Sequence, residues 1–172
     1  MKHGGKRKGA GRPKGQGQYG EPTKPIRLPE SLIEPVLKFV ENKGYQLPLF
    51  TSKVSAGLPA TIDDHIETHI DLHQLLIKNT GTTFLVRVSG HSMIDAGIHE
   101  KDLLIVDRKI SPTNGKIVIA TIDGQLTVKR LYQKNNQLYL MPENKKFKPI
   151  PITEENHMMI LGVVTNVIHS LL

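Results

Sequence analysis

The sequence IVIATIDGQLTVKRLY at residues 117–132 decides the fold of this chain of 172 residues. A run that is apolar except for Thr121, residues 117–122, precedes the dipeptide Asp123-Gly124, and apolar and polar residues largely alternate after it. Asp-Gly between two such runs indicates a tight turn that joins antiparallel strands. The first run is apolar on both faces, which is typical of a strand buried within a sandwich or barrel. The stretch therefore predicts a β-hairpin in the core of a mainly β domain.

Similar short apolar runs predict further strands at residues 84–88, 103–106, 138–141 and 162–168. Together these runs predict one compact, mostly β domain from about residue 60 to residue 172. Residues 28–59 precede it as a linker. Within the linker, Ser31 and Glu34 have the spacing of a capping box, which predicts a short helix through Val40.

The linker leaves two interpretations open. Ile26 and Leu28 alternate like a short strand before the helix, which resembles the start of a ribbon-helix-helix DNA-binding unit, but a simple linker helix fits equally well. Pro35 is expected in the first helical turn, where its missing N–H costs little. Residues 46–61 are expected to be an extended connector, and residues 65–78 a short helix or an irregular arm.

The N-terminal arm, residues 1–27, carries the whole net charge of +7. It holds eight Lys or Arg and one Glu, whereas residues 28–172 hold 15 basic and 15 acidic residues. Because it has almost nothing apolar to bury, we expect it to be disordered when free. A basic arm favours weak binding to duplex DNA, and a merely solubilising tail is the alternative. The residues expected to contact nucleic acid, some within a segment that resembles an AT-hook, are Lys6, Arg7, Lys8, Arg12 and Lys14.

Ser92 and Lys129 are the candidate catalytic residues. A serine hydroxyl is a weak nucleophile until a base removes its proton, and a lysine can be that base when it is neutral. The pKa of a lysine, about 10.4 in water, falls when the ammonium is buried in an apolar site. Lys129 lies on the second strand of the predicted hairpin, on the same face as Thr127 and opposite Val128, and is expected to point inward.

The residues around Ser92 favour a tight turn that presents its hydroxyl. Gly90 permits such a turn directly after the predicted strand at 84–88. The backbone N–H groups of His91 and Ser92 are then expected to form an oxyanion hole. From the residues alone, a plain loop with a solvated serine is the alternative.

Residues 45–172 resemble the LexA/UmuD family of self-cleaving serine–lysine peptidases. The resembling segments are SGHSMIDAGI at 89–98, DLLIVD at 102–107, NGKIVIA at 114–120, DGQLTVKRL at 123–131 and LGVV at 161–164. The resemblance implies a β-rich peptidase domain with Ser92 as nucleophile and Lys129 as general base. Because the family cuts between a small residue and glycine, it also implies cleavage between Ala56 and Gly57, without a cofactor.

The closer resemblance is to the UmuD branch, through DLHQLLI at residues 71–77 and PLF at 48–50. It implies a subunit of an error-prone translesion DNA polymerase, active in SOS mutagenesis, that a RecA–single-stranded DNA filament stimulates to cleave itself. The implied partners are a second copy in a homodimer and a UmuC-like polymerase. The alternatives are a LexA-like repressor that the same cleavage inactivates and an enzyme that cuts other proteins.

His65, His69 and His73 are four residues apart and would share one face of a helix, a spacing that suits a metal ion. The family stretch that contains His73 has no ligand pattern, so no metal site is expected. The chain has no cysteine and no apolar run long enough to span a bilayer. We therefore expect a cytoplasmic protein without disulfides or membrane insertion.

Overall fold

The computed structural model describes residues 22–42, 44–51, 66–135, 137–153 and 157–171. The chain divides into two units, Met1–Tyr45 and Gln46–Leu172. Strands dominate the second unit, so the predicted mainly β fold is confirmed. Within the described ranges, no helix is both long and apolar enough to cross a membrane.

Helix α1, Glu30–Glu41, contains the predicted linker helix, but it does not begin as predicted. Pro29 is its N-cap residue and no side chain caps it, so the capping box assigned to Ser31 is wrong. The ring of Pro29 already holds φ at −54°, which sets the entry into the helix one residue before Ser31. Pro35 consequently lies in the interior of the helix and not in its first turn. At an interior position its missing N–H removes one intrahelical hydrogen bond.

Residues 22–29, directly before α1, have no regular structure, so the predicted short strand at Ile26 and Leu28 is wrong. The Ile26 side chain is 72% exposed. Two alternating apolar residues with no partner strand gain no ladder hydrogen bonds. Of the two interpretations of this region, the structure supports a linker helix rather than a strand followed by a helix.

Strands β1 (Gln46–Phe50) and β2 (Ile66–Asp71) form a two-stranded antiparallel sheet. The sequence predicted only an extended connector for the first and a helix or an arm for the second. Their pairing was missed because each strand is short and the partner is separated by a long connection. The predicted cleavage residues, Ala56 and Gly57, belong to this connection in the sequence but lie outside the described residues.

A short helix, α2 (Leu72–Leu76), follows β2 directly. The Asp71 carboxylate caps it by accepting hydrogen bonds from the backbone N–H groups of His73 (2.8 Å) and Gln74 (3.2 Å). Residues 66–76 are therefore a strand followed by a helix, and not the single helix or arm that the sequence predicted.

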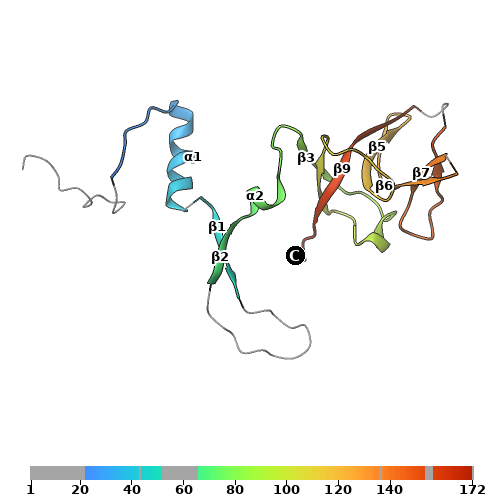
Figure 1. Ribbon diagram of the computed structural model, residues 1–172, viewed down its shortest axis with the longest axis horizontal. Coiled ribbons are helices and arrows are strands. Elements are labelled where there is room, and N and C mark those ends of the chain that lie inside the picture. The colour runs from blue at the N-terminus through green and yellow to red at the C-terminus, as the bar shows by residue number, and fades with distance from the viewer. Residues whose placement is uncertain (1–21, 43, 52–65, 136, 154–156, 172) are drawn as a thin grey trace, which may run out of the picture. The chain divides into compact units, whose positions relative to one another are not determined.

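The main body is an antiparallel sheet of seven strands in the order β3-β4-β9-β5-β6-β7-β8 (Figure 1). The strand bounds are β3 Thr83–Arg87, β4 Leu103–Asp107, β5 Ile117–Ile122, β6 Gln125–Lys134, β7 Gln137–Met141, β8 Ile150–Pro151 and β9 Met158–Ile168. All six strands predicted in this region are present. The two-residue β8 was not predicted, because so short a segment has no readable period.

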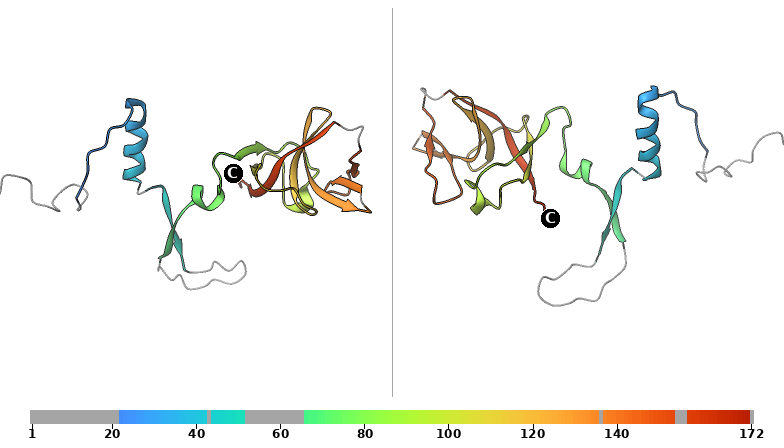
Figure 2. Two further views of the ribbon diagram at one scale, coloured as in Figure 1. Left: turned by 45° about the horizontal axis from the view of Figure 1, so that its top comes forward. Right: turned by 180° about the vertical axis from the view of Figure 1, so that it is seen from behind.

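Strand β9 crosses the body and joins its two sides, pairing with β5 over its first half and with β4 over its second (Figure 2). Gly162 lies near the middle of this crossing. A Cβ at this position would lie 2.8 Å from Val106 Cγ1 and 3.0 Å from the Asp107 carbonyl oxygen. Glycine is therefore required here by the close approach of β9 to β4.

The hydrophobic core forms two clusters on opposite faces of β5. One cluster contains Val88, Met93, Ile98, Leu104, Val106 and Ile119. The other contains Val118, Ala120, Leu131, Leu140 and Val163. Val118 and Ile119 are adjacent in β5, and neither side chain is more than 1% exposed, so the predicted burial of this strand on both faces is confirmed.

Candidate active site

Ser92 lies in the loop between β3 and the short 3₁₀ helix η1 (Ile94–Ala96). Gly90 has φ of 90°, a conformation that other residues rarely adopt, so the predicted glycine-dependent turn is confirmed. Directly after Ser92, the Met93 side chain is 1% exposed and belongs to the first core cluster. The loop is thus tethered to the core at the residue next to the serine.

A second tether comes from residues 143 and 144. The backbone N–H of Glu143 donates to the Ser92 carbonyl oxygen (2.8 Å), and Asn144 Nδ2 donates to the His91 carbonyl oxygen (2.7 Å). Asn144 is 8% exposed. Sequence analysis missed both residues, since nothing in their local pattern links them to a loop some fifty positions earlier.

Lys129 projects from β6 toward this loop and is 7% exposed, so the predicted inward orientation is confirmed. Its Nζ lies 2.8 Å from Ser92 Oγ. It also lies 2.8 Å from Thr127 Oγ1 and 2.9 Å from the Val128 carbonyl oxygen. The structure thus brings together the two candidate catalytic side chains, which are 37 residues apart in the sequence.

No carboxylate forms an ion pair with Lys129 in the part of the chain that the structure describes. The three oxygens around its Nζ are all uncharged. Burial therefore lowers the pKa of Lys129, because the desolvated ammonium has no counter-charge. Arg130, the next residue, differs: its guanidinium pairs with the Glu143 carboxylate and donates to the Gly115 carbonyl oxygen.

A hollow of about 200 Å³ opens beside Ser92. Its apolar lining consists of Val86, Val88, Leu104, Ile119, Leu126 and Val128, and its polar lining of Arg87, Ser89, Ser92 and Thr127. A concave, mainly apolar surface next to a nucleophile is suited to binding a small apolar side chain of a peptide.

The backbone N–H groups of His91 and Ser92, expected to form an oxyanion hole, donate to no other group among the described residues. The carbonyl oxygens of the same two residues are held by Asn144 and Glu143. The bond from Asn144 thus fixes the peptide unit that joins His91 to Ser92, while the N–H group of that unit, which belongs to Ser92, stays available to a bound substrate.

Most of the other predicted site residues fall in segments that the structure does not describe. Ala56, Gly57 and the basic residues Lys6, Arg7, Lys8, Arg12 and Lys14 lie outside the described residues. His69 is on β2 and His73 in α2, so the expected single helical face does not exist; His65 lies outside the described ranges. One cluster that the sequence did not indicate is formed by His99, Asp102 and His169.

Comparison with known proteins identifies relatives of two kinds. Residues 48–165 match the family model described as Peptidase S24-like. The LexA repressor of Bacillus cytotoxicus is 38% identical over 152 residues, which are 88% of this chain and 71% of that protein. The LexA repressor of Clostridium perfringens is 36% identical over 136 residues, 79% of this chain and 64% of that protein. Protein ImpA of Salmonella typhimurium is 40% identical over 129 residues, 74% of this chain and 87% of that protein.

The family match covers more than half of the chain and includes both Ser92 and Lys129. It also includes β2 to β8 and most of β1 and β9, that is, nearly the whole second unit. The chain therefore belongs to the peptidase S24-like family, the LexA/UmuD family that its sequence motifs resemble.

Proposed function

We propose that this chain is a serine peptidase that cleaves itself between Ala56 and Gly57, with Ser92 as nucleophile and Lys129 as general base. The proposal rests on the 2.8 Å contact between Lys129 Nζ and Ser92 Oγ, at a position where burial lowers the pKa of the lysine. A nucleophile and a base within hydrogen-bond distance are the minimum arrangement for such catalysis.

The hydrogen-bond geometry suits a neutral lysine. An amine without its third proton has two N–H donors and one lone pair. The two donors are satisfied by Thr127 Oγ1 and the Val128 carbonyl oxygen, at 2.8 and 2.9 Å. The lone pair is then directed at the hydroxyl proton of Ser92, which is the proton that must leave when the serine attacks.

In the proposed reaction, Ser92 Oγ attacks the carbonyl carbon of Ala56 while its proton passes to Lys129 Nζ. The N–H groups of His91 and Ser92 stabilise the oxyanion that forms. The bond between the Ala56 carbon and the Gly57 nitrogen breaks, and Lys129 returns the proton to the new amine of Gly57. A water molecule then hydrolyses the Ala56 ester with Lys129 again as base, which regenerates Ser92.

The hollow beside Ser92 supports Ala56 as the residue before the cut. A methyl side chain fits a small apolar site, and Gly57 lets the backbone approach the serine closely. A RecA–single-stranded DNA filament would accelerate the reaction by favouring the conformer in which this segment occupies the site, which is a population shift and not new chemistry.

For the biological role, we propose a cytoplasmic UmuD-like subunit of an error-prone translesion polymerase. The similarity to Protein ImpA, of which the chain spans 87%, supports this assignment, as does DLHQLLI at residues 71–77. The cleaved product, residues 57–172, would remain a homodimer and bind a UmuC-like polymerase.

The second candidate is a DNA-damage-responsive repressor; relatives whose name is LexA repressor, which match up to 88% of this chain, support a repressor role. The basic arm would then bind an operator, and cleavage after Ala56 would detach it from the dimer. Both candidates share the peptidase chemistry; they differ in what the N-terminal part does before the cut and in whether the cleaved product serves a polymerase.

Incubation of the purified chain at alkaline pH followed by mass spectrometry tests the chemistry. The expected fragments are residues 1–56 and 57–172. Ser92→Ala and Lys129→Ala should each remain intact, because each lacks one half of the nucleophile–base pair. Normal processing in either variant would refute the proposal.

Two substitutions outside the site serve as matched controls. Ser111→Ala removes an exposed serine from the loop before β5, and Lys134→Ala an exposed lysine from β6 itself. Both controls should cleave at the rate of the unmodified chain. Thermal unfolding of all four variants shows whether any loss of cleavage reflects a loss of folding.

DNA binding before and after cleavage separates the two roles. If four to six basic residues of the arm contact phosphates, the log–log salt slope should be roughly −4 to −5, and cleavage should remove most of the binding. A polymerase subunit should bind nearly without sequence preference, with at most a bias toward A·T pairs. A repressor should prefer one operator by about a thousandfold or more over random DNA.

A further inference from the structure

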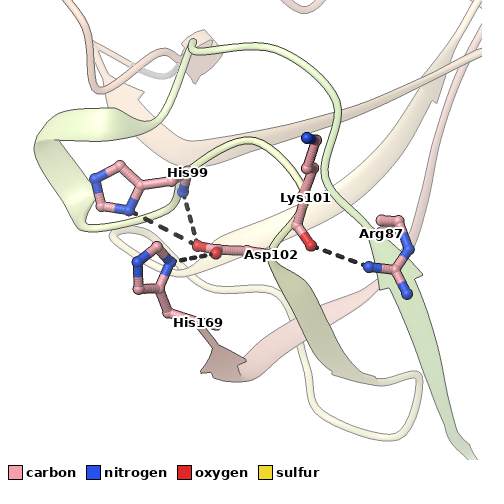
Figure 3. Close-up of polar contacts among 5 residues, drawn as sticks. All are labelled: Arg87, His99, Lys101, Asp102 and His169. Atoms are coloured by element: carbon pink, nitrogen blue, oxygen red, sulfur yellow. Dashed lines mark hydrogen bonds and ion pairs between the residues drawn. The ribbon is translucent and has the colours of Figure 1, made fainter. Parts of the chain in front are cut away.

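The pairing of β4 with β9 places Asp102 opposite His169. Leu103, at the start of β4, is the register partner of Ile168, at the end of β9. In an antiparallel pair the residues just beyond such partners face each other. His169 Nδ1 accordingly lies 2.6 Å from Asp102 Oδ1, although the two residues are 67 positions apart (Figure 3).

His99 reaches the same carboxylate from the other side. The turn at residues 99–102 brings the His99 backbone N–H to Asp102 Oδ2 at 2.8 Å. The His99 ring nitrogen Nδ1 lies 3.9 Å from that oxygen, and the rings of His99 and His169 have centroids 5.1 Å apart. Two neighbouring imidazoles therefore converge on one buried carboxylate (Figure 3).

Accessibility differs sharply within this cluster. The Asp102 side chain is 2% exposed, whereas the His99 and His169 side chains are 50% and 46% exposed. The carboxylate is fixed, and each imidazole has one side in water. The contact between His169 and Asp102 is sufficient to join the ends of β9 and β4. The second imidazole, that of His99, comes from a separate loop, and its position beside the same carboxylate needs another explanation.

We propose that His99, Asp102 and His169 bind one divalent transition-metal ion, with Zn²⁺ as the best fit. One ligand atom from each of the three residues lies within 4.8 Å of the others. Zn²⁺ binds imidazole nitrogen and carboxylate oxygen at about 2.0–2.2 Å in a tetrahedron, so its ligand atoms are about 3.3 Å apart. The distances from Asp102 Oδ1 to His169 Nδ1 (2.6 Å) and from Asp102 Oδ2 to His99 Nδ1 (3.9 Å) lie on either side of that value.

Because no two of the three ligand atoms are more than 4.8 Å apart, small movements of the two half-exposed imidazoles would bring them to this spacing. Water would complete the tetrahedron on the open side. Imidazole nitrogen suits Zn²⁺ as a ligand, so the site needs no cysteine, a residue that this chain lacks. The harder ions Mg²⁺ and Ca²⁺ prefer all-oxygen sites and are not expected to bind here.

An ion at this position would fix the end of β9 to the segment that leads into β4. The Asp102 carbonyl oxygen accepts from the Val88 N–H (2.8 Å), and the Lys101 N–H donates to the Val88 carbonyl oxygen (3.0 Å). Arg87 also donates to the Lys101 carbonyl oxygen (3.1 Å; Figure 3). Bound metal should therefore stabilise the base of the loop that carries Ser92 without touching Ser92.

Titration of the full-length chain with ZnCl₂, by calorimetry and by competition with the visible absorption of bound Co²⁺, tests the proposal. One ion per chain should bind, and the midpoint of thermal unfolding should rise with it. His99→Ala and His169→Asn should each weaken this binding by roughly tenfold or more, since each removes a ligand. His99→Ala keeps the backbone bond to Asp102, and His169→Asn keeps an N–H donor, so neither should unfold the chain.

His73→Ala and His157→Ala are the matched controls, because both remove a histidine that lies elsewhere and both should bind Zn²⁺ normally. Failure of the chain to bind Zn²⁺ or Co²⁺ would overturn the proposal and leave the cluster as a hydrogen-bonded closure of the sheet. Binding that persists in His99→Ala and His169→Asn would overturn it as well, since the ion would then lie at other histidines.

Discussion

Lys129 and Asp107 are both buried charged side chains on strands of the same sheet, but their surroundings are opposite. Asp107 accepts hydrogen bonds from Thr82 Oγ1 (2.7 Å), the Lys109 N–H (2.8 Å) and Asn79 Nδ2 (3.2 Å). These donors, Thr82 first, hold the pKa of Asp107 below its ordinary value. Lys129 has only uncharged oxygens around it, and burial lowers its pKa.

In both cases the side chain is desolvated, but only at Asp107 does the protein stabilise the charged form. The charge on Asp107 therefore contributes to folding, since it ties β4 to the segment that precedes β3. At Lys129 the charged form is disfavoured, which makes the amine available as a base at a cost in stability. Hydrogen-bond partners therefore distinguish the two residues: those of Asp107 stabilise its charge, and those of Lys129 leave its amine reactive.

The largest effect is expected when a carboxylate is placed beside Lys129, so that its charged form is stabilised as that of Asp107 is. Thr127→Asp places one where the hydroxyl oxygen now lies 2.8 Å from Nζ. A charge that close raises a lysine pKa by about 1–3 units, so self-cleavage below that pKa should slow by roughly 10- to 1,000-fold. Rates are measured from fragment yield over time.

Thr127→Asn is the matched control, since it has the shape of Asp without the charge and should cleave much faster than Thr127→Asp. The gap between the two variants should narrow as pH rises, because alkali neutralises the lysine in both. Equal rates in Asp and Asn variants at every pH would contradict a neutral lysine base.

The pH dependence of the unmodified chain is the second test. Because burial lowers the pKa of Lys129, the neutral form becomes available below the ordinary lysine value. Unassisted cleavage should accelerate about tenfold per pH unit up to that pKa and then level off. A rate that does not change between about pH 6 and 10 would exclude a lysine base.

The stabilised charge is tested by Asp107→Ala. The variant leaves the Thr82, Asn79 and Lys109 donors without their common acceptor, so the midpoint of thermal unfolding should fall by about 5 °C or more. Cleavage at a temperature where the variant is folded should be unchanged. Asp95→Ala, which removes an exposed carboxylate from η1, should leave both measurements unchanged.

The same substitution has a distinct pH signature. The pKa of Asp107 is lower in the folded chain than in the unfolded one, so its contribution to stability is complete above about pH 4 and is lost as pH falls through the folded value. The difference in stability between the unmodified chain and Asp107→Ala should therefore shrink in acid. A difference that stays constant down to about pH 2 would show that its charge is not what stabilises the fold.

What the sequence predicted correctly depends on neighbouring residues. The Asp123-Gly124 turn, the two buried faces of β5 and the inward side of β6 all follow from local periods of the chain. These patterns were sufficient to place Lys129, and the glycine at position 90 was sufficient to predict the turn before Ser92. The inward position of Lys129 and the turn before Ser92 could therefore be predicted from the sequence.

What the sequence could not predict depends on register between distant strands. Asn144 contacts the peptide of His91 across 53 positions, and His169 reaches Asp102 across 67. Neither partner belongs to a local motif: Asn144 and His91 lie in loops, and a slip of one residue between β4 and β9 would separate His169 from Asp102. Such contacts become visible only when the order and register of the strands are known.

The smallest expected effect is a gain in the free energy of unfolding when Lys129 is replaced by an apolar residue. Lys129→Met has a similar length and no charge, so it removes the desolvation cost of the ammonium. We expect it to abolish cleavage and yet raise the free energy of unfolding by about 1 kcal/mol near pH 7, read from denaturant midpoints. The sign follows from the lowered pKa: below the folded value the folded chain buries a charged amine, and between the folded and unfolded values folding must remove a proton that the unfolded chain keeps. The gain should disappear above about pH 10.5, where the amine is neutral in both states.

Arg130→Met is the control, because the neighbouring guanidinium has a carboxylate partner. This substitution should instead destabilise the chain at every pH where Glu143 is charged. If Lys129→Met were as destabilising as Arg130→Met, the lysine would be a structural charge like Asp107, and its place beside Ser92 would no longer indicate a base.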